Sequence, residues 1–214
     1  MASAEPGRAE PRLVVMVSGS GTNLQAILDA VHAGAKASPG DEEAVLHAKV
    51  ALVISNNPDA YGIERAKAAG VATSILPHQG RDRFEYDTEL AYEATIAGAD
   101  LVVLAGWNRV LTDNFLAHHT VINLHPAKPG AFPGLGAIGK AYEAWQRGEV
   151  SSGGVMVHYV PDEGVDDGPV IDWVEVPFVE GDTLETFEQR VHHAEHRLLV
   201  KSITIALNEQ RAKL

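Results

Sequence analysis

The chain has 214 residues, 45% of them hydrophobic, which is enough to bury one sizeable core, so a single domain is expected. Its 29 acidic and 17 basic side chains give a formal charge of -12, which argues against nucleic acid as a partner. The sequence contains no cysteine, which excludes disulfide bonds, thiolate catalysis and cysteine-type zinc sites. No apolar run approaches the roughly 20 residues that cross a bilayer, so no membrane partner is expected and a cytoplasmic, enzyme-sized domain is the prediction.

The chain begins with a polar stretch, residues 1–11, which lacks the apolar segment of a secretory signal and is predicted to be a disordered tail. The apolar run 13–17 then predicts a strand buried on both faces of a parallel sheet. It leads into the Gly-rich stretch 18–23, and apolar residues at helical spacing follow. The free N–H groups at the start of such a helix form an anion site, most simply for a phosphate, and Thr22 or Asn23 is expected to cap the helix or contact the anion.

Two familiar phosphate loops do not match this stretch. A Walker A loop needs Lys and then Ser or Thr after its last Gly, and that pair is absent. The dinucleotide fingerprint needs a third Gly, where this chain has Leu24, and an acidic end to the second strand, which here ends in Ser55-Asn56-Asn57. The loop therefore favours a phosphate monoester over a nucleotide cofactor. A packing turn without a ligand is the alternative.

Helices and strands alternate along the rest of the chain. A polar surface loop is predicted at 34–47. The predicted strands are 50–54, 71–76, 101–105, one ending at His125, 153–159 and 170–176; the predicted helices are 59–69, 84–97, 112–118, one within 134–148, and 183–207. The last two strands carry polar alternation, which is typical of an antiparallel or edge pair. This order predicts an α/β fold with a doubly wound, mostly parallel sheet.

Polar side chains gather at the end of one predicted strand. Alternation places Asn123 and His125 on one side of it, and Pro126 cannot continue the ladder, so the strand should end at His125. The acidic loop 161–169 follows downstream, and its Asp166 is expected to join the pair. Such a trio suits direct attack of an amine on a carbonyl group, because Asn123 and His125 can donate to an oxyanion while Asp166 accepts or relays a proton. A capped strand and a solvated acidic turn form the alternative.

The closing helix holds His192 and His196 at positions i and i+4, a spacing that can chelate a metal ion. The order is not that of a His-Glu-x-x-His motif and the sequence suggests no third ligand, so a polar helix face is preferred and no metal is expected. Glu195 on the same helix could point inward at a ligand. The remaining histidines are interpreted as structural.

Taken together, these motifs resemble the phosphoribosylglycinamide formyltransferase family, the folate-dependent transformylases of purine synthesis. The likeness runs from about residue 13 to residue 207 in the family's order, and its motifs are 18–27, 54–57, 104–111, 122–126 and 166–169. The resemblance implies a Rossmann-like formyltransferase domain over 12–214. It also implies transfer of a formyl group from the co-substrate 10-formyltetrahydrofolate to the amine of glycinamide ribonucleotide, in de novo purine (IMP) biosynthesis, through direct amine attack and a tetrahedral intermediate.

The resemblance implies roles for individual residues. The catalytic residues are Asn123, His125 and Asp166, where Asp166 is chosen over Asp167 because the family pattern is Asp-x-Gly-Pro. The implied substrate-binding residues are Gly21, Thr22, Asn23 and Glu195. The implied folate-binding residues are Arg83, Asn108, Arg109, Val110, Leu111 and Asp162. Three departures from the family are Asn108, where many relatives carry Met, Gly136, where a polar residue is expected, and the loop 158–169, which is one residue longer than in common bacterial forms and shifts the position of Asp162.

Three other functions are weighed against the transferase. A related hydrolase releases formate from the folate to water but carries an N-terminal regulatory domain, and methionyl-tRNA formyltransferase carries an extra C-terminal domain and would need a basic face. Length and charge favour a transferase of small molecules. Either a monomer or a homodimer is expected. The third is a non-catalytic module that binds a phosphorylated metabolite, against which the trio of reactive side chains argues.

Overall fold

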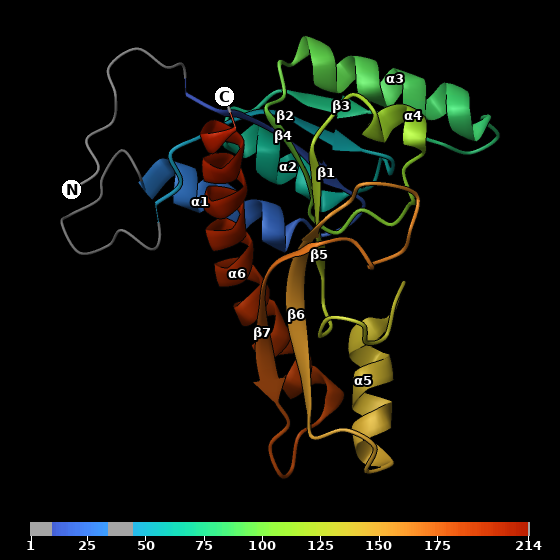
Figure 1. Ribbon diagram of the computed structural model, residues 1–214, viewed down its shortest axis with the longest axis vertical. Coiled ribbons are helices and arrows are strands. Elements are labelled where there is room, and N and C mark those ends of the chain that lie inside the picture. The colour runs from blue at the N-terminus through green and yellow to red at the C-terminus, as the bar shows by residue number, and fades with distance from the viewer. Residues whose placement is uncertain (1–9, 34–44, 214) are drawn as a thin grey trace.

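The computed structural model describes residues 10–33 and 45–213, which form one sheet of seven strands in the order β3-β2-β1-β4-β5-β6-β7 (Figure 1). The strands are β1 (Arg12–Val17), β2 (Lys49–Ser55), β3 (Thr73–Ile75), β4 (Leu101–Leu104), β5 (Val121–His125), β6 (Ser152–Tyr159) and β7 (Val170–Pro177). The helices are α1 (Thr22–Ala33), α2 (Tyr61–Ala68), α3 (Arg83–Ile96), α4 (Asp113–Leu116), α5 (Ala137–Gln146) and α6 (Leu184–Ala212). The predicted α/β, doubly wound fold in a single domain is confirmed.

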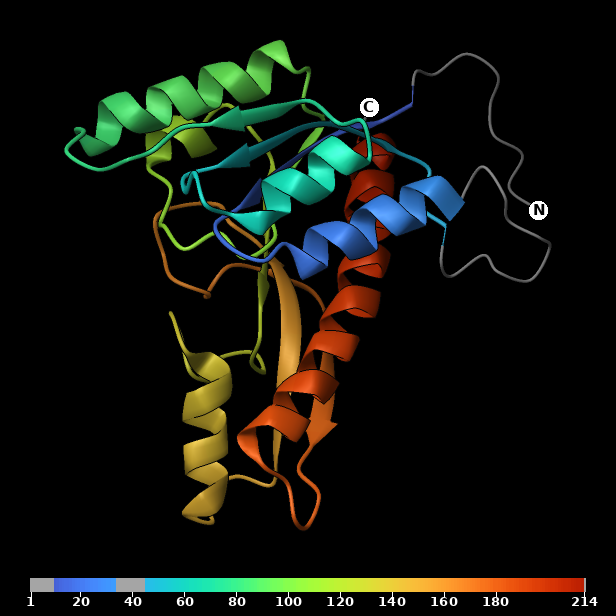
Figure 2. The same ribbon diagram turned by 180° about the vertical axis from the view of Figure 1, so that it is seen from behind.

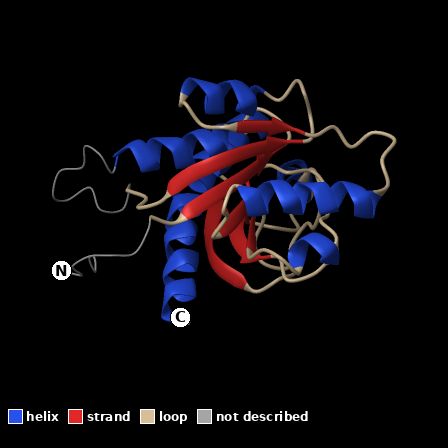
Figure 3. Cartoon of the chain, turned by 90° about the horizontal axis from the view of Figure 1, so that it is seen from above, coloured by secondary structure: helices blue, strands red, loops and turns tan. Residues whose placement is uncertain are grey.

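The core lies on both faces of the sheet, and β1 shows why its sequence is an uninterrupted apolar run. Leu13, Val15 and Val17 pack with α1, α2 and α6, which lie together on one face (Figure 2). Val14 and Met16 point to the opposite face and pack with residues of α3 and α4. All five side chains are fully buried, as expected for a central parallel strand covered on both sides. Figure 3 shows these two helical layers with the sheet between them.

The strand order places the ligand-binding edge. From β1 the chain moves outward through β2 to β3, and α3 then returns it to β4 on the other side of β1. The loops after β1 and β4 therefore leave neighbouring strand ends in opposite directions. This reversal of strand order is where open α/β sheets bind ligands, at the carboxyl ends of the strands.

The β5–β6 and β6–β7 pairs are antiparallel, as the polar alternation of the final two strands predicts, whereas β5 is parallel to β4. The β6 and β7 strands, together with α5 and the first turns of α6, extend below the parallel part of the sheet in Figure 1. In the register between β5 and β6, Asn123 lies opposite His158 and His125 lies opposite Met156. Asn123 therefore faces a histidine of the neighbouring strand.

Several predicted boundaries differ from the structure. Helix α6 continues to Ala212, five residues beyond the predicted end. Helix α1 begins at Thr22, so Thr22 and Asn23 are its first two residues instead of its N-cap. Helix α2 begins at Tyr61 because the backbone N–H of Asp59 is held in a turn by the Asn57 side chain.

Two predicted segments lie partly or wholly outside the described residues. Residues 1–9 of the expected tail are among them, whereas Pro11 is buried and its carbonyl oxygen accepts a hydrogen bond from Lys49 N–H at 2.7 Å. Most of the predicted surface loop, residues 34–44, is also outside.

Candidate active site

The end of β5 presents Asn123 and His125 to one side of the sheet, and the loop after β6 brings Asp166 against them. Asn123 Nδ2 donates to Asp166 Oδ1 at 3.0 Å, and His125 Nδ1 lies 3.2 Å from Asp166 Oδ2. His125 is 3% exposed, so this contact is shielded from water. The structure therefore brings together the three side chains that the strand-end motif and the acidic loop predict.

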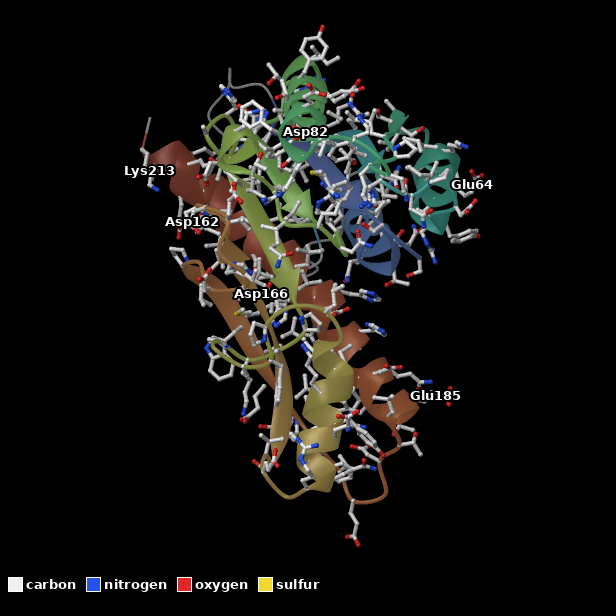
Figure 4. All side chains as sticks on the ribbon, turned by 90° about the vertical axis from the view of Figure 1, so that its right-hand side faces the viewer. Glu64, Asp82, Asp162, Asp166, Glu185 and Lys213 are labelled. Carbon is white, nitrogen blue, oxygen red and sulfur yellow. The ribbon has the colours of Figure 1, made fainter. Side chains whose placement is uncertain are left out.

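Asp166 is held in place by its backbone as well as by its partners. Its φ of +55° lies in the left-handed region, which Asp and Asn adopt more readily than most residues. Its Oδ2 also accepts a hydrogen bond from Gly134 N–H at 2.8 Å, which links the acidic loop to the loop before α5. Figure 4 shows Asp166 next to that loop, while Asp162 lies farther out.

Burial and neighbouring charges set the protonation of the pair. Burial lowers the pKa of His125 below its ordinary value of 6.5, although the Asp166 carboxylate acts in the opposite direction. Burial alone would raise the pKa of Asp166, but hydrogen bonds involving His158 and Gly134 N–H, with the charges of the two histidines, outweigh it and leave the pKa below 3.8. At neutral pH the pair is therefore a carboxylate beside a mainly neutral imidazole.

His158 is a member of this cluster that was interpreted from the sequence as structural. Its Nε2 lies 3.1 Å from Asn123 Nδ2 and 3.6 Å from Asp166 Oδ1, and its Nδ1 lies 2.8 Å from the carbonyl oxygen of Tyr159. It is 2% exposed. A histidine in an otherwise apolar strand, just before the acidic loop, is the signal that the sequence offers.

A cavity of about 300 Å³ opens beside the trio. Its polar end is formed by Asn123, His125, His158 and Asp166. The rest of its wall is largely apolar and comes from the end of β4 with the segment after it, the loop before α5 and the acidic loop, including Leu104, Trp107, Val110, Leu111, Leu135 and Val165. An apolar wall with polar groups at one end suits a flat, mostly apolar ligand whose reactive group points at the trio.

Four of the predicted folate-binding residues, Asn108 to Leu111, line this cavity. Leu111 is buried and Val110 is exposed. The guanidinium of Arg109 lies over the Tyr86 ring at 4.8 Å, and within the described chain its Nε has no hydrogen-bond partner. Gly136, a second noted departure, also lies in the cavity wall.

Arg83 and Asp162 do not line the cavity. Arg83 Nη1 pairs with Glu163 Oε2 at 2.9 Å, and its Nη2 donates to the Val110 carbonyl oxygen at 3.3 Å. Glu163 Oε1 also accepts from Asp113 N–H at 3.2 Å. Asp162 is exposed, and its side chain accepts a hydrogen bond from Gly164 N–H within its own loop. Arg83 thus connects the acidic loop to the cavity wall, and Asp162 shapes the turn.

The Gly-rich loop lies at the carboxyl end of β1, and the predicted substrate-binding residues meet there. Asn23 Nδ2 donates to Glu195 Oε2 at 3.1 Å, although α1 and α6 are far apart in sequence. The same oxygen lies 2.8 Å from His192 Nδ1, and this hydrogen bond raises the pKa of His192. Glu195 is 4% exposed, so it does point inward, as the sequence suggested.

Arg65 of α2 also belongs to this region and was missed from the sequence. Its Nε donates to the Ser20 carbonyl oxygen at 2.8 Å, and its Nη1 donates to Gln25 at 3.2 Å. It lines a shallow hollow of about 440 Å³, together with Thr22, Gln25, Ala26, Asp29, His193, His196 and Arg197. The sequence could not predict this position, because a single arginine on a helix forms no recognisable motif. Arg65 reaches the Gly-rich loop only through the packing of α2 against α1.

The tight approach of α1 and α2 requires glycine at position 21. Its φ is +70°, and a Cβ atom there would lie 2.5 Å from the Cα of Gly62. We expect Gly21→Ala to lower the free energy of unfolding by about 3 kcal/mol or more, since backbone strain adds to a clash with main chain. Urea denaturation measures this loss.

Gly80→Ala is the matched control for that substitution. Gly80 has a similar φ of +74°, but nothing lies within 4 Å of its added Cβ. Only the conformational strain remains there, which costs about 1–2 kcal/mol. Equal losses for the two variants would show that the contact between Gly21 and Gly62 is unimportant.

Across residues 10–33 and 45–213, no group of three or more acidic or histidine side chains is arranged to hold a metal ion. His192 is instead engaged by Glu195. Over the same residues, no helix has both the length and the apolar character that a membrane crossing requires.

Comparison with known proteins identifies the chain's relatives. The formyl transferase family profile matches residues 11–203. The phosphoribosylglycinamide formyltransferase of Schizosaccharomyces pombe is 43% identical over 204 residues, covering 89% of this chain and 94% of the relative. The Escherichia coli enzyme of the same name is 38% identical, covering 87% and 82% respectively.

Solved structures of the same enzyme from other organisms share the fold of this chain. Glycinamide ribonucleotide transformylase 1 from Symbiobacterium toebii superimposes with a TM-score of 0.80 at 38% identity, covering 93% of this chain and 91% of that one. Phosphoribosylglycinamide formyltransferase from Campylobacter jejuni gives a TM-score of 0.82 at 34% identity, covering 94% and 100%. The resemblance inferred from the motifs is confirmed: the chain belongs to the formyl transferase family and, within it, to the phosphoribosylglycinamide formyltransferases.

Proposed function

We propose that this enzyme transfers the formyl group of 10-formyltetrahydrofolate to the amine of glycinamide ribonucleotide, a step of de novo purine biosynthesis. One observation carries the proposal: Asp166 contacts both Asn123 and His125 at the polar end of a largely apolar cavity. A flat pterin ring suits the apolar wall, and the unpaired Nε of Arg109 in that wall suits a carboxylate, so the residues present fit a folate. The bound folate supplies an activated formyl group.

The chain's own residues would stabilise charge and move a proton. His125 Nε2 lies 3.2 Å from the carbonyl oxygen of Phe132, so an oxygen atom already lies within hydrogen-bond distance of this nitrogen. We assign to it donation of a hydrogen bond or a proton to the formyl oxygen as negative charge develops there. Asn123 Nδ2 serves as the second donor, and Asp166 orients His125 and takes up the proton released by the amine, directly or through water. As the tetrahedral intermediate collapses, the bond between the formyl carbon and the folate nitrogen breaks, and the proton taken from the amine passes to that nitrogen.

The phosphate of the amine substrate is assigned to the Gly-rich loop. Gly21, Thr22 and Asn23 open helix α1, whose free N–H groups favour an anion. Arg65 adds a cation beside the loop, and Glu195 offers a carboxylate to polar groups of the same substrate. The amine substrate would thus span from α1 to the trio along one edge of the sheet.

The folate is assigned to the cavity formed by Asn108, Arg109, Val110 and Leu111. Arg83 and Asp162, which the resemblance assigns to the same co-substrate, would act by shaping the acidic loop, since their contacts are with that loop. We further propose a cytoplasmic enzyme that acts as a monomer or homodimer without a metal ion. The absence of cysteine supports a compartment where disulfide bonds are not needed, and the charge of -12 supports small-molecule substrates over nucleic acid.

Absorbance of a 10-formyl folate, followed with and without glycinamide ribonucleotide, tests the proposal. Deformylation that requires the amine is the expected result. Consumption of the folate without the amine would identify a hydrolase that releases formate. Binding of both compounds without turnover would identify a non-catalytic module.

The link between Arg83 and Glu163 gives a further testable result. Arg83→Glu should raise KM for the formyl folate by about 2- to 5-fold, because an exposed ion pair contributes only about 0.2–1 kcal/mol. The double variant Arg83→Glu with Glu163→Arg should recover part of the loss at low salt, and 0.5 M salt should reduce the difference. Steady-state kinetics at two salt concentrations measure this. A double variant with a higher KM than Arg83→Glu alone would contradict an ion-pair role.

A further inference from the structure

Asn108 lies between the two proposed substrate regions. Asn108 lines the folate cavity, and its side chain also reaches the start of the Gly-rich loop. Ser18 Oγ donates to Asn108 Oδ1 at 2.9 Å, and the same hydroxyl accepts from Asn108 N–H at 3.1 Å. The loop after β1 is therefore bonded through a reciprocal pair to the loop after β4.

The end of β2 joins the same set of contacts. Asn56 Nδ2 donates to Asn108 Oδ1 at 2.8 Å, and Asn57 Nδ2 donates to the Ser18 carbonyl oxygen at 3.1 Å. A backbone bond from Ser18 N–H to the Gly106 carbonyl oxygen, at 3.0 Å, lies alongside. Three loops from three neighbouring strands thus meet at one amide oxygen.

The chemistry of that oxygen makes it difficult to replace. Asn108 Oδ1 receives two donors, one from the Gly-rich loop and one from Asn56, which is 2% exposed. An apolar side chain at position 108 would leave both the buried amide of Asn56 and the Ser18 hydroxyl without this acceptor. The loop after β1 would keep two bonds, from residue 108 N–H to Ser18 Oγ and from Ser18 N–H to Gly106, but would lose the shared oxygen that ties it to Asn56.

We propose that Asn108 is a positioning residue that couples the folate cavity to the phosphate-binding loop, so that a ligand in the cavity strengthens binding of the phosphorylated amine. This inference rests on the proposed function of the two sites. Movement of the segment 106–111 on ligand binding would be transmitted to Ser18, because the two are joined by three hydrogen bonds. The effect is reciprocal, since each ligand must change the affinity for the other by the same factor.

The test compares Asn108→Leu with Asn114→Leu in the full chain. Asn114 Nδ2 donates to Thr88 Oγ1 at 2.7 Å, and Asn114 lines neither the cavity nor the hollow beside the Gly-rich loop. Titration calorimetry would give Kd for glycinamide ribonucleotide with and without a saturating 5,8-dideazafolate that carries no formyl group. We expect the unmodified protein and Asn114→Leu to bind the amine more tightly when the folate analogue is present, and Asn108→Leu to lose roughly 10-fold of that affinity and to become nearly insensitive to the analogue.

Amide hydrogen exchange of residues 18–21 gives a readout that needs no substrate. Exchange should be roughly 10-fold faster in Asn108→Leu than in the unmodified protein, and unchanged in Asn114→Leu. Ser18→Ala provides a second route: it shares with Asn108→Leu the loss of the bond from Ser18 Oγ to Asn108 Oδ1, so the double variant should lose less than the sum of the two single variants. Unchanged exchange at 18–21, or full retention of the coupling in Asn108→Leu, would overturn the inference. Faster exchange together with failure of the unmodified protein to bind the amine would refute the proposed function, and with it the substrate coupling, while the loop contact itself would stand.

Discussion

Replacing His125 with alanine is expected to lower kcat by on the order of 100-fold or more, with KM for both substrates changed only a few fold. The imidazole is positioned between two oxygens, with Nδ1 3.2 Å from Asp166 Oδ2 and Nε2 3.2 Å from the Phe132 carbonyl oxygen. We propose that His125 stabilises the transition state, in which negative charge develops on the formyl oxygen. Loss of a donor that acts only there lowers turnover more than binding.

His118→Ala is the matched control for that change, because His118 is exposed and lies outside the cavity wall. Its kcat should equal that of the unmodified protein. His125→Gln retains an amide donor of similar reach, so it should lose less turnover than His125→Ala. Single-turnover formyl transfer, monitored by absorbance, separates chemistry from product release. Near-normal turnover of His125→Ala would remove His125 from the mechanism.

The parts of the fold that the sequence predicts best are those with strong local patterns. The run 13–17 and the strand end at His125 match the structure to within one residue, since a buried parallel strand has a continuous apolar sequence and Pro126 ends the ladder. The end of α6 was predicted five residues early. Its last turns carry Asn208 to Arg211, which continue the helix but not the apolar period on which the prediction depended.

Site residues that depend on pairing between distant segments were harder to predict. His158 reaches Asn123 only because β6 runs antiparallel to β5 in one particular register, and the pairing of β6 with β7 is irregular next to it. Arg65 reaches the Gly-rich loop only because Gly21 and Gly62 let α1 and α2 approach closely. Periodicity along one segment contains none of this information.

The nine residues of the acidic loop include one position that a local pattern predicts and one that distant contacts determine. Asp166 was chosen from the Asp-x-Gly-Pro pattern, and the structure places it, not the exposed Asp167, against His125. Asp162 was assigned to folate binding, yet it bonds within its own turn because Glu163 is held by Arg83 and by Asp113 N–H. Those anchors are about 50 or more residues away and fix which carboxylates of the loop face inward.

Replacing Asp166 with asparagine is expected to reduce kcat by on the order of 100-fold and to lower the pKa of His125 further. Asparagine is the suitable replacement because it tolerates the φ of +55° at this position, so the backbone should be preserved. The carboxylate raises the pKa of His125 against the larger, opposite effect of burial. Without this negative charge, the effect of burial on the pKa of His125 is less strongly opposed. Imidazolium should therefore form at a more acidic pH than in the unmodified protein.

Two measurements separate the charge of Asp166 from its shape. Nitrogen NMR titration of His125 gives the pKa in each variant, and the pH profile of kcat gives the consequence for turnover. Asp167→Asn removes a neighbouring exposed carboxylate and should leave both quantities nearly unchanged. If Asp166→Asn raised the pKa of His125, the carboxylate would not be the group that favours imidazolium. If turnover stayed within about 10-fold of the unmodified protein, proton uptake from the amine would have to pass to another acceptor, and His158, 3.1 Å from Asn123, is the side chain placed to provide one.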